Sequence, residues 1–387
     1  MMRIGIDATA LPSRPVGAGN YIIQLIRAIS QHIAINDSLP DSSQPDGLEF
    51  VIFVQRSRLD LLRVEETQSL HLVVLPNLSP SMRLLWEQIS LPGLAKSHQL
   101  DLLHSLHYTM PLAYPGRTVV TIHDMTFFLF PHYHTLLKRY FFRFFIRTSS
   151  HQAVALIADS ESTRQDAIRL VGVPPGKIYT AQLGVTQEFR PIQDHMILLA
   201  ARQKYHLPER FLLYVGMIEP RKNLSTLLQA YATIADQIPD HRLVVVGPKG
   251  WMVENILQQT ERLNISDKVH FTGYVEQADL PLLYNMADVF IYPSVYEGFG
   301  LPILEAMACG TPVITSNVSS MPEIVGDAGI QLAPSDSQAL ARSLLELIND
   351  PVIRQRLSKK GLERAAAFTW DRTAEKTIAV YRQVLCH

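Results

Sequence analysis

Residues 288–316 read DVFIYPSVYEGFGLPILEAMACGTPVITS, and this stretch decides the fold class. An apolar, β-branched run at 288–293 leads into a turn with two glycines, and Pro302 stands where a helix begins. Proline is favoured in the first turn of a helix, and a second strand-like run follows at 312–316. A strand, a helix and a strand in this order predict parallel strands joined by a helix that covers the sheet.

The same alternation runs along the whole chain. Strand-like runs occur at 3–7, 49–54, 72–75, 102–105, 118–123 and 154–159, and again at 211–216, 243–247, 269–273, 288–293, 312–316 and 330–332. Between them lie helical segments such as the one after Gly19, where apolar residues from Ile22 to Ile33 recur at spacings of three and four. We therefore predict an α/β chain with two Rossmann-like domains and parallel sheets.

The domain boundary is predicted within 188–208, where a polar, Pro-flanked stretch shows no strand pattern. The N-terminal domain would span residues 1–190 and the C-terminal domain residues 191–370. The last helical segment, 371–387, can pack back on the N-terminal domain or cover the other sheet, and its sequence does not decide which.

Composition excludes several classes of protein. The 387 residues carry 35 basic and 36 acidic side chains, so no global field favours nucleic acid. Two cysteines are too few for a disulfide framework or a zinc cluster, and we assign no metal site. No stretch reaches the ~18 apolar residues of a spanning helix, and the first residues resemble a buried strand rather than a signal peptide. We expect a cytoplasmic protein with a small-molecule substrate.

Two loops after strands are candidate anion sites. Gly216 ends one strand, and Arg221 and Lys222 follow directly before a helix, whose N-terminus offers free N–H groups and a positive dipole. The alternative is a solvated basic turn.

In the second loop, Gly298 and Gly300 free the backbone, so that the amides of Phe299, Gly300 and Leu301 can point at an oxyanion. Glu297 precedes this turn. Glu305 lies inside the apolar helix that follows, where a carboxylate needs a partner such as a ribose diol. The alternative for Glu305 is a partly exposed carboxylate that stabilises the helix dipole.

The N-terminal domain has weaker candidates. Gly17 and Gly19 precede its first helix but lack the third glycine and the acid of a dinucleotide fingerprint, so NAD is disfavoured. His123 ends a strand and can hydrogen-bond a substrate, although an isolated histidine is more often structural. His104 and His107 have a similar position and a weaker claim.

With these residues in place, the sequence resembles the retaining group 1 glycosyltransferases, also called family 4. The resemblance rests on EGFGLPILEAMACGTPVITS, YVGMIEPRKN, FTGYV, ADVFIYPS, TIHD and ADSESTRQDAI. It implies the GT-B fold, in which two Rossmann-like domains face each other across a cleft. The N-terminal domain would be the acceptor side, and the C-terminal domain would bind the nucleotide-sugar donor.

The resemblance also implies roles for individual residues. Glu297 would contact the donor sugar, the GFGL amides would hold the diphosphate, Lys222 would meet the phosphates and Glu305 would bind the ribose. The donor site would further include Arg221, Gly17, Gly19, Gly216, Tyr274, Val275, Gly298, Phe299, Gly300 and Leu301, and the catalytic set would be Glu297, His123, Lys222 and Arg221. Many members carry an arginine directly after Gly216, where this chain has Met217, so the role of Arg221 is less defined.

The form EPRKN resembles bacterial mannosyltransferases of polysaccharide assembly, which makes GDP-mannose the leading donor. The expected reaction moves a hexose from a nucleotide sugar to a glycan or lipid-linked acceptor with retained configuration. No two aspartates are separated by a single residue, which agrees with a reaction that needs no metal and no other cofactor.

Other activities stay open. A sugar-nucleotide epimerase, a phosphorylase with pyridoxal phosphate and a non-catalytic sugar-binding protein would share much of the pattern.

The helical run at 136–151 places Arg139, Arg143 and Arg147 four apart among phenylalanines, which suits peripheral contact with an anionic membrane. Burial of that aromatic face against the sheet is the stronger alternative.

Overall fold

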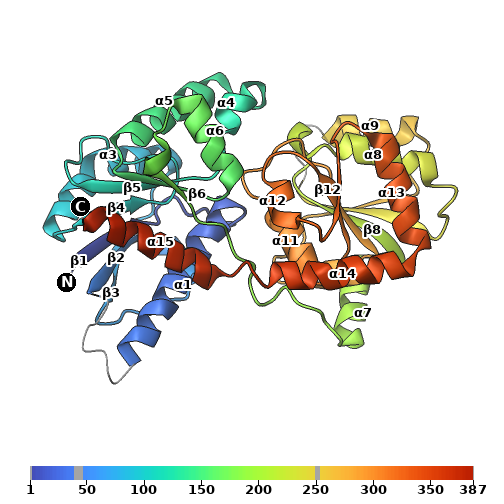
Figure 1. Cartoon of the computed structure of the whole chain (residues 1–387), viewed down its shortest axis with the longest axis horizontal. Coiled ribbons are helices and arrows are strands. Elements are labelled where there is room, and N and C mark those ends of the chain that lie inside the picture. Colours follow the sequence, from blue (N-terminus) through green and yellow to red (C-terminus); the bar gives the residue numbers. More distant parts are fainter. Residues whose placement is uncertain (1, 39–46, 249–252, 387) are drawn as a thin grey trace. The chain divides into compact units, whose positions relative to one another are not determined.

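The computed structural model describes residues 2–38, 47–248 and 253–386, which form two compact units. Unit 1 comprises Met1–Gly184 and Thr369–His387, and unit 2 comprises Val185–Phe368. These bounds lie a few residues before the predicted 190 and 370. Unit 1 is discontinuous because the last helix, α15 (Trp370–Leu385), returns to it and packs against α1 (Figure 1).

Unit 1 is a seven-stranded parallel sheet in the order β3-β2-β1-β4-β5-β6-β7. Its elements before α15 are β1 (Met2–Asp7), α1 (Ala18–Ser38), β2 (Leu48–Gln55), α2 (Leu59–Leu62), β3 (Leu70–Leu75), α3 (Pro80–Ser97), β4 (Leu102–Ser105), β5 (Arg117–Ile122), α4 (Thr126–Leu129), α5 (Leu136–Gln152), β6 (Ala155–Ala158), α6 (Glu161–Val171) and β7 (Ile178–Thr180), with 3-10 turns at Arg56–Arg58, Pro131–Tyr133 and Pro175–Lys177. The predicted strands are confirmed. Strand β7 was not predicted, because its three residues are too few to show a pattern.

Different helices cover the two faces of this sheet. On one face, His104 of β4 lies with Nδ1 2.6 Å from the hydroxyl of Tyr381 in α15 and Nε2 2.8 Å from Oγ1 of Thr121 in β5. The hydroxyl of Tyr21 in α1 lies 2.9 Å from the same Thr121 oxygen. The opposite face packs against α3 and α5 through two apolar clusters that include Leu91 of α3 and Ile146 of α5. His104 is therefore a structural residue that joins α15 to the sheet.

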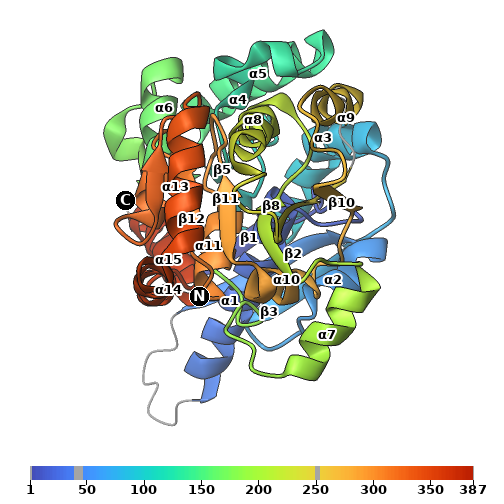
Figure 2. The same ribbon diagram turned by 90° about the vertical axis from the view of Figure 1, so that its right-hand side faces the viewer.

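Unit 2 is a six-stranded parallel sheet in the order β10-β9-β8-β11-β12-β13. Its elements are α7 (His195–Lys204), β8 (Arg210–Val215), a 3-10 turn (Pro220–Lys222), α8 (Leu224–Ile234), β9 (His241–Val246), α9 (Val253–Arg262), β10 (Val269–Gly273), α10 (Leu280–Met286), β11 (Val289–Tyr292), α11 (Leu301–Ala308), β12 (Val313–Ser316), α12 (Met321–Val325), β13 (Ile330–Leu332), α13 (Ser337–Asn349) and α14 (Pro351–Ala365). Helices α8 and α13 pack against each other beside the sheet (Figure 2). The strands match the predicted runs.

The strand order marks where each sheet is suited to hold a ligand. In unit 1 the chain order reverses between β1 and β4, and in unit 2 between β8 and β11. Connections on the two sides of such a point diverge and leave a crevice at the carboxyl ends of the strands. Within the residues that the structure describes, no helix is both long and apolar enough to cross a bilayer.

Candidate functional site

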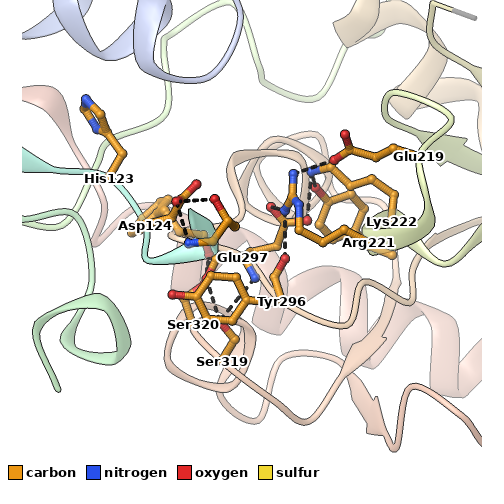
Figure 3. A network of polar contacts seen from close by, with 12 residues as sticks. His123, Asp124, Glu219, Arg221, Lys222, Tyr296, Glu297, Ser319 and Ser320 are labelled. Carbon is orange, nitrogen blue, oxygen red and sulfur yellow. Dashed lines mark hydrogen bonds and ion pairs between the residues drawn. The ribbon is translucent and has the colours of Figure 1, made fainter. Parts of the chain in front are cut away.

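The two predicted anion loops of unit 2 meet at the carboxyl ends of β8 and β11. Glu297, in the loop after β11, accepts hydrogen bonds from Arg221 Nη1 at 2.8 Å and from Lys222 Nζ at 2.8 Å (Figure 3). Arg221 Nη1 also donates to the carbonyl oxygen of Tyr296 at 2.7 Å. A main-chain bond of 2.9 Å from Val295 N to the carbonyl oxygen of Arg221 joins the same loops. The loops therefore form one site.

The charges in this site are balanced. Arg221 Nη2 donates to Glu219 Oε1 at 2.6 Å, so two cations face the carboxylates of Glu219 and Glu297. Burial alone would raise the pKa of Glu297, but Arg221 and Lys222 outweigh it and lower that pKa to about 2. Both cations have a carboxylate partner, and Glu297 stays ionised at neutral pH.

Lys222 is held deep in the site. Its Nζ donates to the hydroxyl of Tyr292 at 2.5 Å, as well as to Glu297, and lies 5.0 Å from the centre of the Tyr292 ring. Burial lowers the pKa of Lys222, although the carboxylate of Glu297 opposes that effect. An ammonium group has three N–H donors. Two are used among the described residues, which leaves one for an anion.

Two serines hold the backbone of the GFGL loop, which comprises residues 298–301. Gly300 is the N-cap of α11 with φ of 116°, a conformation that side chains with Cβ rarely adopt. Glu297 N donates to Ser319 Oγ at 3.1 Å. Ser320 Oγ donates to the carbonyl oxygens of Glu297, at 3.0 Å, and Phe299. The loop therefore has a fixed backbone.

The front of the same loop presents main-chain donors. Among the described residues, the N–H groups of Phe299, Gly300 and Leu301 have no hydrogen-bond acceptor. They precede and open α11, so the positive end of the helix dipole adds to their partial charges. These are the three amides that the sequence proposed as an oxyanion cradle.

Glu305 is buried four residues into α11. Its side chain belongs to a residue that is 8% exposed, and burial raises the pKa of the carboxyl to about 7. The hydroxyl of Tyr284 donates to Oε2 at 3.0 Å and is the one partner recorded within the described residues. The alternative of a partly exposed helix-start carboxylate is wrong. The carboxylate oxygens keep lone pairs for a second donor, as a ribose hydroxyl would supply.

The other predicted donor-site positions of unit 2 lie in neighbouring loops. Gly216 follows β8 and its N–H donates to the carbonyl oxygen of Val246 at 2.9 Å. Val275 is buried after β10, whereas Tyr274 is about half exposed. Asn223 is the N-cap residue of α8, with φ of 56°, and its side chain makes no capping bond.

The Asn223 amide has a different role. Its Nδ2 donates to the carbonyl oxygen of Pro293 at 2.9 Å and to that of Pro334 at 2.6 Å. It therefore ties the Arg221–Lys222 turn to the ends of β11 and β13. Sequence reasoning also missed Glu219, Tyr292, Ser319 and Ser320, because nothing in the pattern of single residues distinguishes them from ordinary loop and strand positions.

His123 lies in unit 1, directly after β5. Its Nδ1 is 2.8 Å from Asp159 Oδ2 and its Nε2 is 2.8 Å from the carbonyl oxygen of Leu106. Burial alone would lower the pKa of His123, but Asp159 and the Leu106 carbonyl reverse the direction and raise it. An imidazolium that donates to both acceptors fits this geometry. Both ring nitrogens are therefore used inside unit 1, as the structural alternative requires.

Gly17 and Gly19 form the entry to α1. Gly17 has φ of 51°, and a Cβ on Gly19 would lie 3.0 Å from the side chain of Pro12. A tight turn into the helix accounts for both glycines. The structure brings Arg221, Lys222, Glu297 and the GFGL amides into one site of unit 2, and it places His123, Gly17 and Gly19 in unit 1.

Two family models match the chain in succession. The model of "Glycosyltransferase Family 4" matches residues 43–189, and that of "Glycosyl transferases group 1" matches residues 200–364. The second match contains the whole Arg221–Glu297–Glu305 region.

Two sequence relatives with assigned activities are mannosyltransferases. The chain is 37% identical over 268 residues to the O-antigen chain mannosyltransferase B of Escherichia coli, a match that covers 69% of this chain and 70% of that protein. It is 33% identical over 242 residues to the serotype-specific mannosyltransferase WbdA of Escherichia coli. That match covers 60% of this chain and 29% of the longer relative.

Solved structures establish the fold. Sucrose-phosphate synthase from Thermosynechococcus elongatus superposes with a TM-score of 0.77 at 23% identity, over 100% of both chains. HepE from Anabaena, solved in complex with UDP-glucose, superposes with a TM-score of 0.74 at 19% identity, over 99% of this chain and 100% of that one. The predicted GT-B fold, with two Rossmann-like domains, is confirmed.

Proposed function

Because this chain belongs to the group 1 glycosyltransferases, we propose that it is a hexosyltransferase that moves mannose from GDP-mannose to a glycan or lipid-linked acceptor. The observation that carries the proposal is the contact of Glu297 with Arg221 and Lys222, beside three amides that have no acceptor within the described part of the chain. The mannosyltransferase names of two relatives support the choice of sugar.

The diphosphate of the donor would lie against the GFGL loop. The amides of Phe299, Gly300 and Leu301 and the third donor of Lys222 would each contribute a charge-assisted hydrogen bond, worth about 1.5–3 kcal/mol. These groups are fixed before the reaction, so they stabilise the negative charge that builds on the departing diphosphate without reorganising. Arg221 supports them by orienting Glu297.

The two glutamates would hold the donor on either side of the diphosphate. Each Glu297 oxygen accepts one hydrogen bond from a cation and has lone pairs left for sugar hydroxyls. Glu305 would accept from the ribose hydroxyls beside Tyr284. Both are therefore binding groups, and neither acts as a nucleophile in this proposal.

The reaction would proceed with retained configuration and without a metal. The bond between the anomeric carbon and the diphosphate oxygen breaks first, and the acceptor oxygen bonds to that carbon on the same face. The acceptor proton passes to the leaving phosphate oxygen, so charge and atoms balance. Cations and helix N-termini would take the place of a divalent ion.

One incubation separates this reaction from the alternatives. Radiolabelled GDP-mannose is offered with a mannose-terminated oligosaccharide, and the products are resolved by chromatography and proton NMR. The proposal expects an extended oligosaccharide with an α-linked mannose, and full activity in EDTA. A free nucleotide sugar with altered stereochemistry indicates an epimerase, and pyridoxal phosphate absorbance in the purified protein indicates a phosphorylase. No turnover with tight sugar binding indicates a binding protein.

Contact with a membrane is proposed on a separate observation. One face of α5 exposes Leu136, Leu137, Tyr140 and Phe144, which are 57–82% exposed, and Lys138 beside them is also exposed. On the inner side, Phe142 and Ile146 pack into the core, and Arg143 donates from Nε to the carbonyl oxygen of Phe127 at 2.8 Å. The expectation that the sheet buries the aromatic face therefore holds for part of the helix only.

Apolar side chains beside basic ones fit an anionic phospholipid surface. The test is flotation of the full chain with vesicles that contain or lack phosphatidylglycerol. The wild type should float with the anionic vesicles, and Leu137→Glu should not. Val352→Glu, at an exposed position of α14 in unit 2, is the matched control. Equal flotation of the wild type with both vesicle types, or no loss in Leu137→Glu, contradicts membrane contact.

A further inference from the structure

Tyr292 is a buried residue beside Lys222, and the reaction proposed above gives it no role. It ends β11, is 0% exposed and pairs in the parallel ladder with Thr315 of β12. The hydroxyl of Thr315 donates to the carbonyl oxygen of Tyr292 at 2.9 Å. The Tyr292 ring stacks on that of Phe290, with the ring centres 5.9 Å apart. Both the backbone and the ring of Tyr292 are therefore fixed.

The hydroxyl oxygen of Tyr292 is the atom that holds Lys222. Lys222 Nζ donates to it at 2.5 Å, and the direction of this bond is certain because an ammonium group has no acceptor. The centre of the ring lies 5.0 Å from Nζ, twice as far as the oxygen. A change of Tyr292 to phenylalanine would therefore remove the contact and keep the ring.

Two acceptors orient this ammonium group. Tyr292 precedes the loop after β11, and Glu297 lies within that loop, where Oε1 accepts from the same Nζ at 2.8 Å. Together with the bond to Cε, these two contacts occupy three of the four tetrahedral directions at Nζ. The direction of the remaining N–H is then set, and this N–H is the donor left for the diphosphate.

Glu297 alone would orient the ammonium group less well. The group sits on a flexible four-carbon stem, and a single hydrogen bond lets it turn about that contact. Donors that are fixed beforehand stabilise an anion best, because they do not have to reorganise when negative charge develops. Loss of the Tyr292 hydroxyl should therefore weaken the contact of Lys222 with a diphosphate.

The same hydroxyl favours the charged form of Lys222. Burial lowers the pKa of Lys222, the carboxylates of Glu297 and Glu219 raise it, and the guanidinium of Arg221 lowers it. Tyr292 adds no charge, because burial and the charge of Glu297 hold the pKa of its hydroxyl well above the ordinary value. A neutral oxygen that accepts from an ammonium group favours its protonated state. Without this oxygen, Lys222 should lose its proton at a lower pH.

We infer that Tyr292 is a positioning residue of the donor site, whose hydroxyl orients the ammonium group of Lys222 toward the diphosphate. The inference rests on the donor site proposed above for unit 2 and extends that site into β11. It explains why a hydroxyl ends a strand whose other residues are apolar, Val289–Tyr292 with the sequence VFIY. Tyr292 itself needs no contact with the ligand.

Tyr292→Phe tests the inference because it removes the hydroxyl and keeps the ring. GDP affinity of the full chain is measured by calorimetry at several values between about pH 6 and about pH 9.5, a range in which a lysine of lowered pKa titrates. The variant should bind GDP roughly three- to tenfold more weakly than the wild type at neutral pH. The ratio of the two affinities should grow as the pH rises. This ratio cancels the titration of GDP itself, because both proteins bind the same ligand.

Tyr214→Phe is the matched control. Tyr214 lies in β8, which pairs with β11, is 0% exposed, and has a hydroxyl without a hydrogen-bond partner among the described residues. Burial and the charges of Glu297 and Glu219 raise the pKa of Tyr214, so its hydroxyl lies in similar electrostatic surroundings. The control removes a buried phenol oxygen that does not hold Lys222. It should bind GDP as the wild type does at every pH.

A double-mutant cycle shows whether Tyr292 acts through Lys222. In the Lys222→Met background, Tyr292→Phe should leave GDP affinity unchanged, because the ammonium group that it orients is gone. Urea unfolding of each variant checks that the fold is kept. An undiminished loss of affinity in that background would show that Tyr292 acts independently of Lys222 and would overturn the inference.

Two further results overturn the inference alone. One is equal GDP affinity of Tyr292→Phe and Tyr214→Phe, in a wild type that binds GDP. The other is an affinity ratio between wild type and Tyr292→Phe that stays constant or shrinks as the pH rises. If the wild type binds no nucleoside diphosphate at all, the proposed function fails, and the role of Tyr292 fails with it.

Discussion

Lys222 Nζ and Glu297 Oε1 lie 2.8 Å apart in unit 2, in residues whose side chains are 13% and 9% exposed. Each side chain neutralises the charge of the other, which would otherwise be buried without a counter-ion. Together they join the loops after β8 and β11. The pair is thus part of the architecture as well as part of the proposed donor site.

Removal of Glu297 should reduce both stability and turnover. Glu297→Gln keeps the shape but leaves Arg221 and Lys222 with Glu219 alone, which should cost about 3–5 kcal/mol of unfolding free energy, as for a broken buried ion pair. Turnover should fall by ~10² or more. Urea unfolding and initial rates measure the two effects. A double variant, Glu297→Gln with Lys222→Met, should recover part of the stability but none of the activity.

The difference in unfolding free energy between the wild type and Glu297→Gln should depend on pH. The folded-state pKa of Glu297 is about 2, below its usual value, so its contribution is present above the ordinary carboxyl pKa and is lost as pH falls toward 2. The gap in unfolding free energy between wild type and Glu297→Gln should therefore narrow in acid. A constant gap across that range would contradict the ion-pair network.

Glu305 should make nucleotide binding depend on pH near neutrality. Burial raises its pKa to about 7, and a ribose hydroxyl donates a stronger hydrogen bond to the ionised form than to the protonated one. Affinity for the nucleoside diphosphate should rise as pH increases through 7, and binding should release a proton. Calorimetry in buffers of different ionisation enthalpy measures that proton. Glu305→Gln should release none, and an unchanged proton count in that variant would rule out the assignment.

Gly300→Ala should weaken nucleotide binding by distorting the GFGL amides. The φ of 116° is strained for any residue with Cβ, and the added carbon would lie 3.4 Å from Ile303 Cδ1. We expect a loss of about 1–3 kcal/mol in stability and a drop in affinity for the diphosphate. Gly176→Ala, at a position with no neighbouring atom within 4 Å and no positive φ, should change neither. Equal nucleotide affinity in the two variants would argue against the amide cradle.

His123 should titrate above its usual range. Burial opposes the imidazolium, but Asp159 and the Leu106 carbonyl favour it, and the net pKa is raised. The stability that the charged pair contributes is complete below the ordinary histidine pKa and is lost as pH rises through the folded-state value. NMR titration of the His123 ring, with Asp159→Asn as the comparison, measures this. A pKa below 6.5 in the wild type would contradict the geometry.

The fold could be predicted because its signals are local. The stretch at 288–316 shows both strands and the helix of a parallel unit, and the apolar stripe from Ile22 to Ile33 is buried in α1 as expected. The missed strand β7 has three residues, which is shorter than any periodic signal. The sequence does not decide which sheet α15 covers, because the apolar stripe of this helix shows only which side of the helix is buried. The partner depends on contacts with Tyr21 and other distant residues.

Only some residues of the candidate site could be named from the sequence, and their electrostatics could not. Glycines and cations before a helix are visible in the sequence, so Arg221, Lys222 and the GFGL amides could be named. Their pairing depends on distances between residues that are 75 or 76 positions apart, such as Arg221 and Glu297. For the same reason no sequence pattern indicated Ser320 behind the GFGL loop or Tyr292 beside Lys222.

The central claim is that Lys222 and the GFGL amides form one diphosphate site, and calorimetric titration with GDP tests it most directly. Lys222→Met is the decisive variant, because Arg221 still neutralises Glu297 and the fold is kept. We predict one GDP bound per wild-type chain and an affinity at least tenfold weaker in Lys222→Met, which corresponds to about 1.4 kcal/mol. Equal affinity in the two proteins, or no binding of GDP, UDP or ADP to the wild type, would contradict the account.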